Sequence, residues 1–170
     1  MSETFTLYKL IVLYMLQKVD FPLTGAQIFD FILLKGYTNY FTLQQAISEM
    51  TDSNLIKVEN THHRSLYKLS EEGLETIQYF QNKLPPAIRQ DIDAFLKEKQ
   101  FAFKEESSVK ANYFRNSNHE YSVCCQIQEN GSDIINITIN VPNLREAEAI
   151  INNWNLKNQD IYAYLMKELL

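Results

Sequence analysis

Two hydrophobic patterns follow one another along this chain. In the first half, apolar residues recur at the three- and four-residue spacing of helices, and beyond residue 100 they recur at every second position, as in strands. Residues 5–18 are apolar on almost every side, which predicts a helix that is buried all round. Thr24 and Gln27 form a capping-box pattern, so a second helix is predicted from there to the stop at Gly36.

The stretch 42–73 predicts a helix followed by a two-stranded hairpin. Thr42 with Gln45 forms another capping-box pattern, and one buried helix face follows it. The pattern then changes to a period of two on both sides of a polar tip. The apolar positions are Leu43, Ala46, Ile47 and Met50 on the helix, and Ile56, Val58, Tyr67 and Leu69 on the strands. A helix leading into such a ribbon is the second half of a winged helix-turn-helix, an arrangement that reads DNA.

The same stretch holds the candidate residues for contacts with double-stranded DNA. Glutamine suits the paired donor and acceptor of adenine, and the outward face of the predicted reading helix carries two glutamines. Arg64 is the strongest cation at the hairpin tip, where it is expected to meet a phosphate or a minor groove. The candidate DNA-binding residues are Tyr40, Thr42, Gln44, Gln45, Ser48, Lys57, His62, His63 and Arg64.

A resemblance to known regulators rests on the residues of this stretch. NLIKVENTHHRSLYKLSEEG, from Asn54 to Gly73, resembles the wing and following helix of the MarR and PadR groups of bacterial regulators. A broader likeness covers nearly the whole chain, through LYKLIVLYML, YTNYFTLQQ, LSEEG, a proline-started helix, three strands and INNW. That order is similar to an uncharacterised bacterial family of winged-helix proteins, a numbered family of unknown function regarded as regulatory. The resemblance implies a winged-helix fold and a regulatory role.

The second half is predicted to form a smaller α+β domain. Pro85 and Pro86 end one helix and start the next, which divides the chain into a winged helix-turn-helix domain at 1–84 and a dimerisation or sensing domain at 85–170. Period-two alternation predicts a three-stranded antiparallel meander, with Asn130-Gly131 as the turn between its last two strands. The fold class is therefore α+β.

The boundaries within that second domain are more detailed expectations. The first strand is expected to open at Phe101 and Phe103 and to resume at Val109. Two helices, one capped by Asn143 and the other beginning at Asn158, are expected to cover the apolar face of the meander. Trp154, Tyr162 and Tyr164 on these helices line either a core or a pocket for a small effector.

Charge argues against the DNA hypothesis. The net charge is −5, and with 7 of the 16 basic and 9 of the 21 acidic residues lying up to Leu84, neither half is basic. The predicted reading helix has no lysine or arginine outward and carries Glu49 and Asp52, which repel phosphates. The alternative function is therefore a winged-helix module that binds a protein and no nucleic acid. We expect a homodimer for the DNA-binding regulator. The first helix is too apolar for three helices to cover, and a two-fold DNA site needs two reading helices.

Enzymatic chemistry and cofactors are not indicated. No glycine-rich phosphate loop, no nucleophile with a nearby base and no metal-ligand spacing occurs. His62 and His63 are neighbours on a hairpin tip and point apart, and Glu105 and Glu106 are too close in sequence to flank one bond on a strand. Adjacent Cys124 and Cys125 are expected to be reduced thiols, with Cys125 on the apolar side. The absence of a signal peptide and of a membrane-length apolar run predicts a cytoplasmic protein with no membrane partner.

Overall fold

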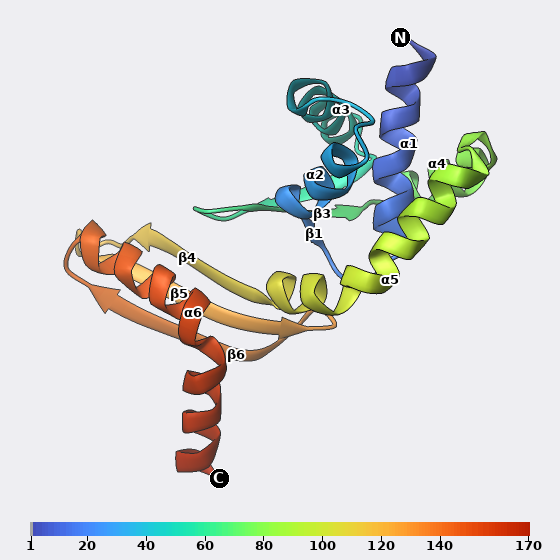
Figure 1. Ribbon diagram of the computed structural model, residues 1–170. Coiled ribbons are helices and arrows are strands. Elements are labelled where there is room, and N and C mark those ends of the chain that lie inside the picture. The colour runs from blue at the N-terminus through green and yellow to red at the C-terminus, as the bar shows by residue number, and fades with distance from the viewer. Residues whose placement is uncertain (1) are drawn as a thin grey trace. The chain divides into compact units, whose positions relative to one another are not determined.

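The computed structural model describes residues 2–170 (Figure 1). Helices and short strands alternate up to Ser108, and a three-stranded meander and one long helix follow. In chain order the elements are α1 Glu3–Gln17, β1 Leu23–Thr24, α2 Gly25–Leu34, α3 Tyr40–Asp52, β2 Ile56–Asn60, β3 Ser65–Leu69, α4 Glu71–Phe80, the 3-10 turn η1 Gln81–Lys83, α5 Pro86–Ser108, β4 Val109–Arg115, β5 Tyr121–Glu129, β6 Ser132–Val141 and α6 Leu144–Leu169. The protein is thus of the α+β class.

The chain divides into two compact units, each with its own apolar core. The first unit comprises the residues up to Asn60 together with Arg64–Ser107, and the second comprises Thr61–His63 together with Ser108–Leu170. The two clusters of buried apolar side chains share no residue. Among residues 2–170, no helix combines the length and the apolarity that crossing a bilayer requires.

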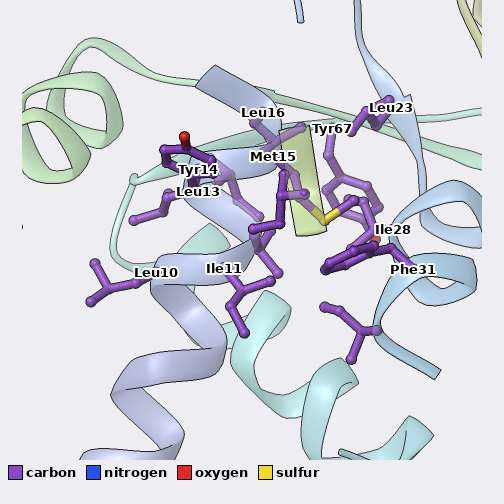
Figure 2. Close-up of a cluster of buried hydrophobic side chains, with 14 of the residues drawn as sticks. Leu10, Ile11, Leu13, Tyr14, Met15, Leu16, Leu23, Ile28, Phe31 and Tyr67 are labelled. Atoms are coloured by element: carbon purple, nitrogen blue, oxygen red, sulfur yellow. The ribbon is translucent and has the colours of Figure 1, made fainter. Parts of the chain in front are cut away.

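Helix α1 lies at the centre of the first unit's core. Its residues Leu10–Leu16 are all buried, so the prediction of a helix covered on every side is confirmed for this part (Figure 2), whereas Phe5, Leu7 and Tyr8 are half-buried. The cover comes from the same chain, because Phe31, Tyr67 and Ile92 belong to the same cluster. Leu10–Leu16 therefore need no second subunit to bury them, and the expectation that a dimer is required for this is wrong. Helix α5 also covers α1, and the expectation that three helices would have to do so did not include it.

The first unit's sheet is antiparallel, with strand order β1-β3-β2. Local capping explains where the adjoining helices begin. The Thr24–Gln27 capping box at the start of α2 is present as predicted, and Ser70 accepts a hydrogen bond from the Gly73 amide at the start of α4. At α3 the predicted cap is wrong: Asn39 is the N-cap, and the Thr42 amide donates to its Oδ1 atom at 3.0 Å. Asparagine is a better N-cap than threonine, so the helix begins three residues earlier.

Helix α5 corrects the expected first strand of the second domain. It runs without a break to Ser108, so Phe101 and Phe103 are helical, and the expectation that they open a strand is wrong. Phe103 is buried in the first core, whereas Phe101 is 87% exposed. Two apolar residues separated by one are compatible with both periods, and the longer spacing from Ile92 through Leu96 to Phe103 is helical. Consequently α5, which starts at the expected prolines, packs with the first unit, and the units divide after Ser107.

The second unit is the predicted antiparallel meander, with strand order β4-β5-β6. Both Asn130 and Gly131 have positive φ angles in the turn between β5 and β6, as the Asn-Gly signal predicts for such hairpins. Asn143 caps α6 by accepting from the Glu146 amide, which confirms its predicted role. The expected new helix at Asn158 is wrong, since α6 is continuous there and the Asn158 side-chain amide donates to the Trp154 carbonyl oxygen at 3.0 Å.

Candidate functional site

Helix α3 presents a polar face on the side opposite the core. Leu43, Ala46, Ile47 and Met50 are buried, and this fixes the rotation of the helix about its axis. Gln44, Gln45 and Ser48 are consequently exposed in its first turns, as the sequence predicts. Their side chains supply hydrogen-bond donors and acceptors of the kind that base edges require.

An ion pair changes the charge of this face. Lys9 of α1 donates from Nζ to Glu49 Oε2 at 2.8 Å, and Gln45 donates from Nε2 to the other carboxylate oxygen at 3.2 Å. The hydrogen bond from Lys9 is the main reason why the pKa of Glu49 lies below its usual value. Lys9 and Glu49 are 40 residues apart, so no local sequence pattern indicates this pair. The charge of Glu49, which counts against phosphate binding, is balanced by a neighbouring lysine.

Aromatic side chains gather at the start of α3. The Tyr40 ring lies 4.9 Å from that of Phe29 and 5.7 Å from that of Phe41, measured between centroids. Tyr40 is half-exposed, Phe41 is 82% exposed and Leu34, at the end of α2, is 74% exposed. The candidate residue Tyr40 therefore belongs to an apolar surface, and the Thr42 side chain, whose backbone amide takes part in the helix cap, is half-buried.

The hairpin of β2 and β3 carries two lysines side by side. Lys57 pairs directly with Lys68 across the antiparallel register, and both side chains are exposed. Directly opposed like charges destabilise a ribbon slightly and attract anions. Lys57 was a candidate from sequence, but Lys68 was missed. Aligning the two apolar strands, Ile56 with Leu69 and Val58 with Tyr67, would have found it.

The hairpin tip is held by contacts within the protein. Arg64 is half-buried and donates from Nη1 to the backbone carbonyl oxygen of Glu106 at 2.9 Å, and its burial lowers the pKa of its guanidinium group. His62 groups with the second unit, where its ring stacks on Tyr113 at 3.5 Å and its Nε2 atom lies 2.8 Å from the Tyr113 carbonyl oxygen. His63 is exposed. Arg64 and His62 thus use their polar groups within the protein, which leaves His63 as the candidate at the tip that is available to DNA.

The other residues considered for catalysis or for ligand binding do not form a common site. Glu105 and Glu106 lie on α5, and Glu106 accepts a hydrogen bond from the Gln27 side chain at 2.8 Å. Trp154 is buried in the second core, and Tyr164 is largely exposed. A shallow pocket of about 370 Å³ lies at the end of α1 in the first unit. Its walls carry Asp20, Lys68 and Glu71 among apolar side chains, and this mixture of charges selects no single class of ligand.

The fold and this surface define an α+β protein with an exposed polar helix followed by a lysine-bearing hairpin. The chain belongs to the family described as "Domain of unknown function (DUF4364)", whose sequence model matches residues 8–169. Comparison with curated proteins and with solved structures gives no match.

Proposed function

We propose that this protein is a DNA-binding transcriptional regulator whose first unit is a winged helix-turn-helix domain. The order α1, β1, α2, α3, β2, β3 corresponds to the order of elements in such domains, with α3 at the position of the reading helix and the β2–β3 hairpin at that of the wing. The sequence pattern of residues 54–73, from which a resemblance to the MarR and PadR regulators was inferred, led to the same hypothesis. The observation that carries the proposal is the exposed row of Gln44, Gln45 and Ser48 on α3.

The charge distribution supports a modest attraction for phosphates. The ion pair with Lys9 balances Glu49, and the exposed Lys57 and Lys68 supply positive charge on the hairpin. The net charge of −5 still opposes association with DNA. Binding that depends on a few lysines loses affinity steeply as salt is raised, because each phosphate contact releases condensed counterions.

The two lysines provide the first test. The change of both Lys57 and Lys68 to alanine should weaken binding to every duplex and flatten the dependence of affinity on salt by about two units of slope. Fluorescence anisotropy with a labelled random duplex, at several salt concentrations, measures both effects. Lys97→Ala is the matched control, because Lys97 is also exposed in the first unit but lies on α5. A slope that is equally reduced in the control would contradict a specific role for the hairpin.

Gln44 tests base recognition separately. Gln44→Ala should narrow the difference in affinity between a duplex selected from a random pool and an unselected one by roughly 1–3 kcal/mol if a bidentate contact is lost. The change should leave the salt dependence unaltered, because it removes no charge. Arg64 is less suitable for such tests, because removing its bond to the Glu106 carbonyl oxygen would also lower stability.

A second candidate function is a protein-interaction module that binds no nucleic acid. Phe41 and Tyr40, which are 82% and 50% exposed and whose rings are in contact, favour it, because large exposed apolar side chains near one another are typical of protein-binding surfaces. If the parent protein shows negligible affinity for every duplex at low salt, α3 does not read DNA, and this second function replaces the first.

A further inference from the structure

The second unit has one long sheet edge that is little protected beyond a register shift at Ile134, near the start of β6. In the order β4-β5-β6, the outer strands are β4 and β6. The seven residues of β4 include Lys110 and Arg115, whereas the ten residues of β6 contain one charge, Asp133, and no lysine or proline. Edge strands in monomers are usually blunted by lysine, proline or short length. β6 therefore has the properties of a strand that pairs with another chain.

The single charge on β6 is held at one end of the strand. The Asp133 carboxylate accepts hydrogen bonds from the side-chain amides of Gln126, Gln128 and Asn136, at 2.7–3.2 Å. These bonds, above all that from Gln128, keep the pKa of Asp133 below its usual value, so the group is charged at neutral pH. The rest of β6, from Ile134 to Val141, is uncharged.

The sheet face beneath α6 is incompletely covered on the β6 side. Val123 of β5 is fully buried under the helix, and Ile127 nearly so. Their neighbours on β6 point to the same side of the sheet. Of these, Ile135 and Ile137 are only half-buried, and Ile139 is 43% exposed. A row of β-branched apolar side chains thus meets solvent beside the open backbone edge.

Helix α6 has an uncovered apolar stripe that matches this deficit. Its inward face is buried at Ala147, Ile151 and Trp154. The same face continues through Ile161 and Leu165, which are half-buried, to Leu169, which is 76% exposed. Figure 1 shows that α6 continues beyond the strands of its own sheet. The last turns of the helix therefore carry an apolar face with no sheet of their own beneath it.

We propose that a second copy of this chain pairs with β6, so that two meanders form one continuous six-stranded antiparallel sheet. Pairing centred on Ile137 places Ile135 opposite Ile139 of the other copy, in the part of β6 that follows the register shift at Ile134 and carries no charge, so that no like charges meet there. A two-fold axis through the joint leaves both α6 helices on one side of the sheet. The last turns of each α6 then lie over the half-exposed isoleucines at the joint.

A second copy suits this surface because the edge is complementary to itself. An isologous interface uses the same patch twice, and a nearly uncharged strand meets its own copy without repulsion. The open edge and the uncovered stripe of α6 are present in the same unit, so each copy supplies what the other lacks. This inference rests on the proposed function, for which the sequence predicts a homodimer, and names the surface through which the two copies would meet. Because it is measured by sedimentation and not by DNA affinity, its failure is distinguishable from a failure of DNA binding.

Sedimentation equilibrium of the full chain tests the interface. At about 50 µM the parent should sediment with twice the chain mass of 19.9 kDa. Ile139→Lys should weaken self-association roughly tenfold or more, since it places a charge in the joint. Phe114→Lys is the matched control: Phe114 is 58% exposed but lies on β4, at the other edge of the same sheet, and this variant should remain dimeric.

A second pair of variants tests the stripe on α6. Leu169→Lys should weaken the dimer, whereas Leu156→Lys should not, because Leu156 is 81% exposed but lies off the stripe. Circular dichroism confirms that each variant is folded. If a variant fails to fold, amide hydrogen exchange of the parent is measured at low and high protein concentration instead. The proposal then predicts slower exchange in β6 at the higher concentration. A parent that is monomeric at this concentration, or a Phe114→Lys variant as dissociated as Ile139→Lys, would overturn the proposal.

Discussion

Two backbone segments approach each other closely at Gly73, and this explains why the LSEEG stretch ends in glycine. It lies in the first turn of α4 and is buried. A Cβ atom at this position would collide with the backbone carbonyl group of Leu55, which also accepts a hydrogen bond from the Ser70 amide at 3.2 Å. A backbone group held in this way cannot move aside cheaply, so only glycine fits.

Gly73→Ala should therefore lower the free energy of unfolding by about 1–3 kcal/mol, the range for forcing extra volume into a packed site. Gly25→Ala is the control, because a Cβ atom there would make ordinary contacts, the nearest at 3.6 Å. This control should leave stability unchanged or raise it by about 0.4–1 kcal/mol, as it restricts the unfolded chain. Urea denaturation measures both, and equal losses in the two variants would contradict the steric explanation.

Cys125 makes stability depend on pH in the alkaline range. Burial on the apolar side of β5, as the sequence predicted, raises the pKa of its thiol from 9.0 to about 11. The folded state holds the proton more tightly than the unfolded state. The contribution to stability is therefore complete below pH 9 and is lost as the pH rises from about 9 to about 11.

We expect the free energy of unfolding of the parent to fall more steeply over this pH range than that of Cys125→Ala. Denaturant unfolding at a series of pH values measures the difference. Tyr37, whose pKa is also raised, mainly by burial, is present in both proteins and does not affect the comparison. Cys124→Ala, at the partly exposed neighbouring position, should behave like the parent. Parallel curves for the parent and Cys125→Ala would refute this prediction.

At the scale of elements, α5 shows how a helix is fixed by partners far away in the sequence. Tyr14 donates from its hydroxyl to Asp93 at 3.2 Å, and Tyr37 donates to Asp91 at 3.1 Å. Each aspartate also has a lysine nearby, Lys18 at 3.9 Å and Lys35 at 3.6 Å. These two groups hold the first turns of α5 against α1 and the end of α2, while its apolar side chains fill the core.

Two phenylalanines test whether the end of α5 is helical. Phe103→Ala should cost about 3–5 kcal/mol of stability, because it leaves a cavity in the first core. Phe101→Ala should change stability by no more than about 0.5 kcal/mol, because its side chain is 87% exposed. On the strand expected from the sequence, both side chains would point to the same face and would behave alike. Thermal unfolding monitored by circular dichroism separates the two outcomes.

At the scale of the whole molecule, the two separate cores predict separate unfolding transitions. The only tryptophan in the chain, Trp154, lies in the second core, so its fluorescence reports on the second unit. Phe103→Ala should lower the transition seen by circular dichroism and leave the Trp154 fluorescence midpoint unchanged. Ile151→Ala, in the second core, should shift the fluorescence midpoint. If Phe103→Ala shifts both midpoints equally, the units unfold as one cooperative body.

The sequence by itself determined the features that depend on near neighbours. The structure confirms the capping residues Thr24 and Asn143, the turn at Asn130-Gly131 and the alternation of the meander, all of which are encoded within a few residues. The outward polar face of α3 follows in the same way from its buried positions. Such signals are strong because hydrogen bonding and amphipathic periodicity act over one or two turns.

Only the tertiary structure decided which residues meet across long separations. The helical state of Phe101 and Phe103 and the burial of α1 by its own chain depend on which segments pack together. The Lys9–Glu49 pair and the contact of Arg64 with Glu106 join residues that are 40 and 42 positions apart. A short apolar pattern is compatible with more than one period, and an arginine at a hairpin tip looks free until its partner is placed. Packing resolves these choices, because burying an apolar face or satisfying a polar group depends on what the rest of the chain brings beside it.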